Sequence, residues 1–91
     1  MISIEEYSSE IGIGISELIG NSRTGKICLA RHAYWFYMKN IKNEKLIIIS
    51  ILFQRTHPTI INGIRSIQNM IDVKDKRIEQ YLKVLNIFSH Q

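Results

Sequence analysis

The chain has 91 residues, 45% hydrophobic and 22% charged, a composition typical of one folded domain and not of a disordered segment. Its longest apolar run is far shorter than the roughly 18 residues of a membrane span, and residues 1–10 lack the basic, apolar pattern of a secretory leader. Cys28 is the only cysteine, which excludes an internal disulfide, so we expect a cytoplasmic protein.

The net charge of +4 hides a separation of charge along the chain. Residues 1–20 hold four glutamates and no lysine or arginine, whereas residues 21–65 hold eight basic residues against Glu44 alone. Such a positive segment is typical of a protein that binds a polyanion, nucleic acid more readily than a membrane. A solvated basic face without a partner would give the same count.

Two short helices are expected in the acidic residues 1–20. Ser3 and Glu6 have the spacing of a capping box, in which each side chain satisfies a free amide at a helix start. Residues 16–19 predict a second helical turn before Gly20. A polar loop, residues 21–25, follows.

Residues 26–41 give the clearest helical pattern in the chain. Its apolar positions recur at helical spacing: Ile27, Ala30, Ala33, Tyr34, Tyr37, Met38 and Ile41. The opposite side is expected to carry Arg31, Trp35, Lys39 and Lys42. Trp35 and Tyr37 could stack on bases, but aromatic residues on a long helix belong more often to the core.

Residues 46–53, LIIISILF, allow either a buried strand or a short buried helix. The next segment favours the helix, because residues 57–71 carry a helical apolar stripe, with Thr56 suited to the N-cap and Pro58 to the first turn. No second segment resembles a strand. The two helices and their turn predict a helix-turn-helix.

A last helix is expected at residues 75–88, with Ile78, Tyr81, Leu82, Leu85 and Phe88 on one face. The prediction is therefore an all-α protein of about six helices in one domain, residues 1–91. It comprises acidic helices in 1–20, a basic region in 21–71 and an extra C-terminal helix.

The residue inventory is poor in catalytic chemistry. His32, His57 and His90 have no metal-ligand spacing with Cys28, and no glycine-rich phosphate loop follows a strand. We therefore expect no enzyme activity, no metal, no cofactor and no nucleotide.

The start of the second helix of the motif has side chains suited to DNA. In a helix-turn-helix this end enters the major groove. His57 and Thr59 can hydrogen-bond base edges, Asn62 can pair with adenine, and Pro58 can contact a thymine methyl group. On local sequence alone, Thr56 could equally serve only as a cap and His57 as an ordinary surface residue.

Residues 13–71 resemble the C-terminal DNA-binding domain (domain IV) of the bacterial replication initiator DnaA, which belongs to the Trp-repressor-like helix-turn-helix group. The most specific element is the run from Arg55 to Thr59, RTHPT, where the family has Arg-Asp-His-Thr-Thr. Supporting matches are Glu17-Leu18-Ile19, the loop with Arg23, and Ala30-Arg31-His32.

The resemblance implies a role for each matching residue. Arg23 would reach into the minor groove, Arg31 and Lys39 would face DNA, and Leu46 would approach a phosphate. His57 and Thr59 keep the family's residue types for major-groove readout. The complete set expected to contact DNA is Arg23, Lys26, Arg31, His32, Lys39, Lys45, Leu46, Arg55, Thr56, His57, Pro58, Thr59 and Asn62.

The chain departs from the family pattern at several positions. Thr56 replaces an aspartate, Pro58 a base-contacting threonine and Ser50 a glycine, and one residue is missing before Arg55. The resemblance implies sequence-preferring binding of double-stranded DNA, without the family's ATPase domain. The alternatives are a protein-interaction module on a former DNA-binding fold, with a second copy or a replication or regulatory protein as partner, and a repressor-type regulator.

Overall fold

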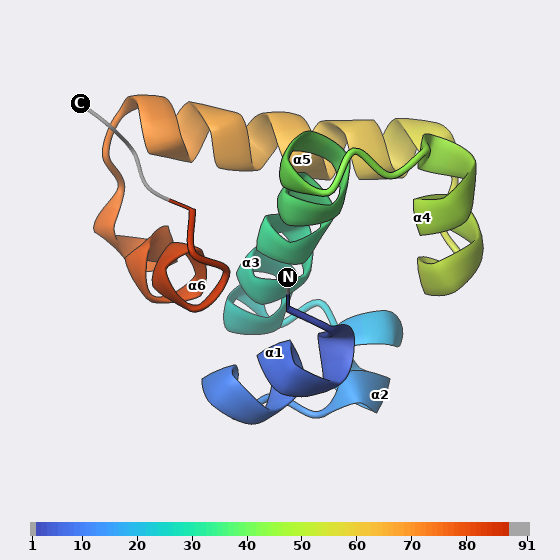
Figure 1. Ribbon diagram of the computed structural model, residues 1–91, viewed down its shortest axis with the longest axis horizontal. Helices are drawn as coiled ribbons and strands as arrows, with labels where there is room; N and C mark the ends of the chain where they lie inside the picture. Colours follow the sequence, from blue (N-terminus) through green and yellow to red (C-terminus); the bar gives the residue numbers. More distant parts are fainter. Residues whose placement is uncertain (1, 88–91) are drawn as a thin grey trace.

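The computed structural model describes residues 2–87, and within them all regular secondary structure is helical, without a strand. This confirms the all-α prediction and the expected six α-helices (Figure 1). In chain order the elements are α1 (Ile4–Ile11), α2 (Ile15–Ile19), α3 (Gly25–Phe36), a π-helical turn (Tyr37–Ile41), α4 (Leu46–Phe53), α5 (His57–Asp72), a 3₁₀ turn (Lys76–Ile78) and α6 (Glu79–Val84).

One hydrophobic core joins the helices around α3. Each other helix contributes a side chain that is at most 1% exposed: Tyr7, Leu18, Phe53, Ile67 and Tyr81, in order from α1, α2, α4, α5 and α6. Figure 1 shows α5 along one side of the molecule and the acidic helices α1 and α2 on the opposite side. The core therefore holds α5 and the acidic helices on opposite faces.

The start of α1 has the predicted capping box. The backbone amide of Glu6 donates to the Ser3 hydroxyl, and the Glu6 carboxylate accepts from the Ser3 amide, both over 3.2 Å. These bonds satisfy two amides that have no partner within the helix.

The long helix is more deeply buried than its amphipathic pattern predicts. Its apolar stripe is buried up to Met38, while Ile41 is exposed. Trp35, which the pattern places on the outer side, is only 1% exposed. That part of the prediction is wrong because α5 covers this side of α3. The expectation that Trp35 and Tyr37 belong to the core is confirmed.

Helices α4 and α5 begin at the predicted residues, Leu46 and His57. The apolar stripe of α5 is buried through Ile60 and Ile67. By contrast, α4 buries only Ile49 and Phe53 and leaves four apolar side chains at least 41% exposed: Ile47, Ile48, Ile51 and Leu52. In the described residues, no helix combines the length and apolar character needed to cross a membrane.

The predicted C-terminal helix is shorter than expected. A 3₁₀ turn precedes α6, which ends at Val84 and is followed by Asn86 with a positive φ of 60°. The packing face is as predicted, with Ile78, Tyr81, Leu82 and Leu85 buried. Phe88 and His90 lie outside the described residues.

Candidate nucleic-acid interface

The helix-turn-helix is formed by α4, a turn of three residues from Gln54 to Thr56, and α5. Gln54 adopts the left-handed conformation, with φ 54° and ψ 48°, and ends α4. The Arg55 amide donates to the Ser50 carbonyl over 3.1 Å, while the Ser50 hydroxyl donates to the Arg55 carbonyl over 2.5 Å. Ser50 therefore closes the turn with two hydrogen bonds.

The first turn of α5 is open to solvent. His57, Pro58 and Thr59 are all exposed, as is Thr56 before them. Thr56 occupies the N-cap position, but its hydroxyl bonds the Thr59 hydroxyl over 2.9 Å and accepts no backbone amide. The N-cap position is thus as predicted, whereas the hydrogen bond expected there is replaced by one between side chains.

A glycine determines which side of α5 faces outward. A Cβ atom at Gly63 would lie 2.7 Å from Cε3 of Trp35 and 2.9 Å from Cδ2 of His32, so α5 packs directly on these rings. Because successive residues of an α-helix are about 100° apart, this contact turns the opposite side of α5 to solvent. Arg65 is exposed there, and Asn62 is exposed about 100° around the helix from the contact.

Arg31 does not face solvent, so the expectation that it faces DNA is wrong. Its side chain is 4% exposed. The guanidinium donates to four backbone carbonyls, those of Glu17, Leu18, Gly20 and Ser22, over 2.6 to 3.2 Å. Burial and the nearby charge of Arg55 lower the pKa of Arg31. The last carbonyls of a helix lack intrahelical partners, which explains why a cation stabilises this end of α2.

Arg55, at the turn of the motif, contacts the same region. It is half-buried and donates to the carbonyls of Ile19, Gly20 and Phe53 over 2.5 to 3.0 Å. The carbonyl of Gly20 therefore accepts from both guanidiniums. Arg55 links the helix-turn-helix to α2, and most of its guanidinium donors are used in hydrogen bonds within the protein.

The loop that carries Arg23 is held by these contacts. Arg31 bonds the carbonyls of Gly20 and Ser22 on one side of Arg23, and on the other side the Thr24 amide donates to the Ser22 hydroxyl over 3.4 Å. Arg23 and Lys26 are themselves exposed. The buried arginine thus fixes the backbone from which an exposed one projects.

The other predicted residues differ in exposure. His32 is half-buried, with its ring centroid 5.0 Å from that of Trp35, and burial together with the charges of Arg31 and Arg55 lowers its pKa. Lys39 and Leu46 are also half-buried. Lys45, the N-cap residue of α4, is exposed.

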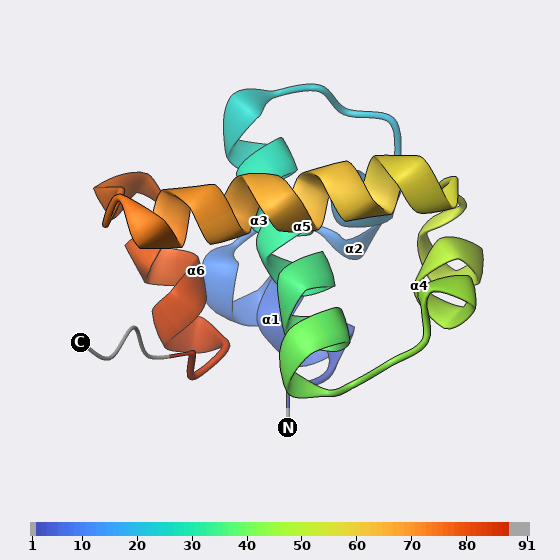
Figure 2. The same cartoon turned by 90° about the horizontal axis from the view of Figure 1, so that it is seen from above.

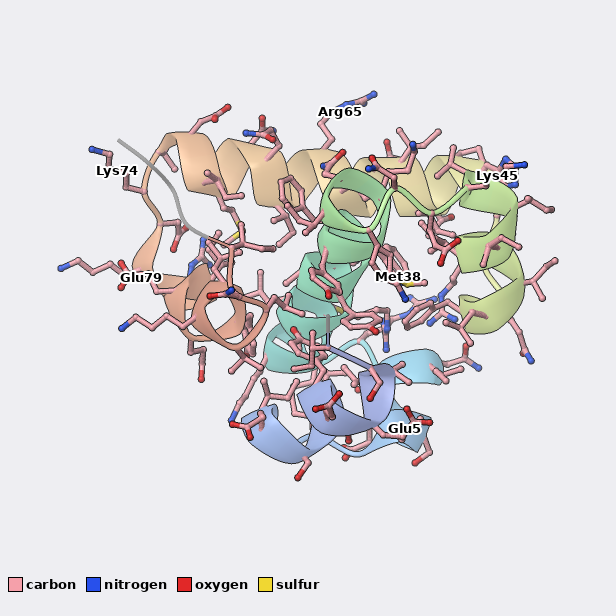
Figure 3. The ribbon with its side chains drawn as sticks, viewed as in Figure 1. Glu5, Met38, Lys45, Arg65, Lys74 and Glu79 are labelled. Carbon is pink, nitrogen blue, oxygen red and sulfur yellow. The ribbon has the colours of Figure 1, made fainter. Side chains whose placement is uncertain are left out.

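The two loops lie on either side of α5. Seen from above in Figure 2, α5 crosses the front of the molecule, with the loop of residues 20–24 on one side and that of residues 42–45 on the other. In Figure 3 the Arg65 side chain extends outward from α5, whereas Glu5 lies on the opposite side of the molecule. Arg65 on α5 is therefore separated from the acidic face of α1.

Arg65 is a candidate that the sequence-based prediction did not include. The available signal was its position three residues after Asn62, which places both on one side of a helix. Among the described residues, no group of three or more His, Cys, Asp or Glu side chains could hold a metal ion.

The comparisons with known proteins agree with this geometry. The family described as the bacterial DnaA protein helix-turn-helix matches residues 4–67. The chain belongs to this family. It is 30% identical over 74 residues to chromosomal replication initiator protein DnaA 1 of Protochlamydia amoebophila, covering 77% of this chain and 16% of the relative.

A second relative, the chromosomal replication initiator protein DnaA of Thermotoga petrophila, is 24% identical over 79 residues, covering 87% of this chain and 18% of the relative. The chain thus spans less than a fifth of the length of these relatives. No solved structure gave a match. Family membership supports DNA binding through the helix-turn-helix.

Proposed function

We propose that the chain binds double-stranded DNA with a sequence preference, with α5 in the major groove. The observation that carries this proposal is the exposed start of α5, where His57 and Thr59 project from a helix-turn-helix of the DnaA family. Arg23 would enter the minor groove beside it, and Lys26, Lys39 and Lys45 would contact flanking phosphates. Phosphate contacts position such a domain, and contacts to base edges give it selectivity.

The acidic face supports this orientation on DNA. Glu5, Glu6 and Glu10 belong to α1, on the side of the molecule opposite α5. Their repulsion by phosphates disfavours approach through that face, whereas the exposed cations attract DNA towards α5. The acidic residues, which are separate from the basic ones in the sequence, thus lie on the face of the fold that points away from the proposed DNA.

A salt titration tests DNA binding itself. With Arg31 committed to the fold, we expect about four to five phosphates to be neutralised, so log K should fall against log salt with a slope of about −3.6 to −4.5. The measurement is fluorescence anisotropy of a random duplex at several salt concentrations. A slope near zero, or no binding at micromolar protein in low salt, would contradict the proposal.

The sequence preference is tested at His57. His57→Ala should weaken binding to the preferred duplex by about 1–3 kcal/mol and hardly change binding to a random duplex, because a base contact discriminates between sequences. The preferred duplex is obtained by selection from a random pool. An equal loss on both duplexes would make His57 a backbone contact.

The alternative function is a protein-interaction module, and one observation favours it. Ile47, Ile48, Ile51 and Leu52 leave an apolar surface on α4, with Ile51 66% exposed. Exposed apolar patches commonly mark sites of protein contact. If the chain binds no duplex at low salt, this interpretation replaces DNA binding. A repressor-type regulator would use the same contacts to DNA and differ only in its biological role.

A further inference from the structure

We propose that base readout by α5 extends beyond the contact predicted at Asn62 to Ile61 and Arg65, and that Arg65 recognises a guanine. The inference rests on the proposed function, because it concerns the same helix in the same groove. It adds a residue that determines specificity, and it predicts which bases the preferred duplex contains.

The first turn of α5 has few free groups with which to recognise bases. Pro58 has neither a backbone donor nor a polar side chain. The hydroxyls of Thr56 and Thr59 already bond one another over 2.9 Å. His57 is therefore the one polar side chain of this turn that has no hydrogen bond within the described residues. A site with a strong sequence preference needs further contacts along the helix.

The following turns supply such contacts. Ile61, Asn62 and Arg65 are exposed, with Ile61 38% exposed. Neither Asn62 nor Arg65 makes a side-chain hydrogen bond or an ion pair in the part of the chain that the structure describes. Arg65 is the single basic residue of α5, and Figure 3 shows its side chain extending away from the protein.

The contact at Gly63 directs these side chains outward. Ile61 and Arg65 each lie two residues from Gly63, which is a rotation of about 200° around the helix axis. They therefore lie almost opposite the point where α5 touches Trp35. When α5 faces a groove, Ile61 and Arg65 point towards its floor.

The spacing along α5 suits neighbouring base pairs. Three residues of helix rise about 4.5 Å, so Asn62 and Arg65 are offset by one to two base-pair steps of about 3.4 Å. Arginine pairs bidentately with O6 and N7 of guanine, asparagine with N6 and N7 of adenine, and an apolar side chain contacts the thymine methyl group. The duplex expected to bind best has a guanine one or two steps from an adenine, with a thymine alongside.

The test compares sequence preferences by selection from a randomised duplex pool, for the wild-type chain, Arg65→Ala and Arg65→Lys. Lysine keeps the charge and can still donate to O6 and N7 of guanine, but it lacks the planar fork of arginine. Lys83→Ala removes one exposed charge from α6, beside Glu5 and Glu10, and serves as the matched control. Circular dichroism establishes that each variant is folded.

We expect Arg65→Ala to lose the preference for guanine at one position, with a fall of about 5- to 150-fold in the affinity for the preferred duplex, and Arg65→Lys to keep a weaker preference at that position. Lys83→Ala should keep the preference. Arg65→Ala weakening all duplexes equally, or keeping the full preference for guanine, would overturn this inference and leave DNA binding intact. A wild-type chain that binds no duplex would overturn both.

Discussion

Arginine has different roles in two basic regions of the molecule. Arg31 and Arg55 lie against the C-terminal end of α2 and donate to backbone carbonyls. Arg65, on the outward face of α5, is exposed and has no such partner among the described residues. A guanidinium that satisfies carbonyls stabilises the fold, whereas one in solvent is available for a ligand. The number of basic residues in a sequence therefore overstates the charge that can contact DNA.

The largest expected difference between the regions is in stability. Arg31→Ala removes a buried side chain and takes a donor from four backbone carbonyls, of which that of Gly20 keeps Arg55, and we expect the free energy of unfolding to fall by about 3–5 kcal/mol. Arg65→Ala changes an exposed residue and should stay within about 0.5 kcal/mol of the wild type. Urea denaturation followed by circular dichroism measures both. Equal losses would contradict the division into buried and exposed arginines.

The two faces of α4 offer a similar contrast between isoleucines. Ile49 is fully buried and Ile51 is 66% exposed. Ile49→Ala should cost about 2–5 kcal/mol through lost burial and a cavity, whereas Ile51→Ala should cost less than about 1 kcal/mol. Denaturation of both variants at low protein concentration gives the comparison. A large loss at Ile51 would show that this apolar face is covered in solution.

The Gly63 contact is expected to have an intermediate effect. Gly63→Ala adds a methyl group against Trp35 and should lower stability by about 1–3 kcal/mol, even though alanine favours a helix by about 1 kcal/mol. Since the helix must shift, duplex binding should weaken as well. Gly25→Ala is the matched control, because nothing lies within 4 Å of a Cβ atom there. A Gly63→Ala variant as stable as Gly25→Ala would contradict the close packing.

Most of the fold could be predicted from the sequence, but only part of the candidate site could. The isoleucine stripe from Ile60 onward determines α5 and, through it, the assignment of α4 as a helix. The burial of Arg31 could not be seen, because its partners are backbone carbonyls of α2 that no side-chain pattern reveals. The end of α6 was also missed, since apolar spacing continues past Val84 although the helix does not.

The smallest expected effect is a pH dependence due to His32. Burial and the charges of Arg31 and Arg55 lower its pKa from 6.5, so the folded state favours the neutral ring. The unfolded chain then binds more protons than the folded one, and stability should be lost as the pH falls below about 6.5. Melting temperatures between pH 7.5 and 5.5 measure this loss.

His32→Gln should flatten that dependence, because the variant has no group that titrates there. His57→Gln, a substitution on the exposed start of α5, should leave it intact. If the wild type and His32→Gln lose stability in parallel, the pH dependence comes from other groups.

Mapping the DNA contact by nuclear magnetic resonance tests the central claim most directly. A short duplex is added to the ¹⁵N-labelled chain, and the shifts of the backbone amides are followed. Binding through the helix-turn-helix predicts the largest shifts at residues 21–26, 45–46 and 55–66, and small ones across α1 and α6. Shifts concentrated on α1 and α6, or none at any residue, would contradict the account.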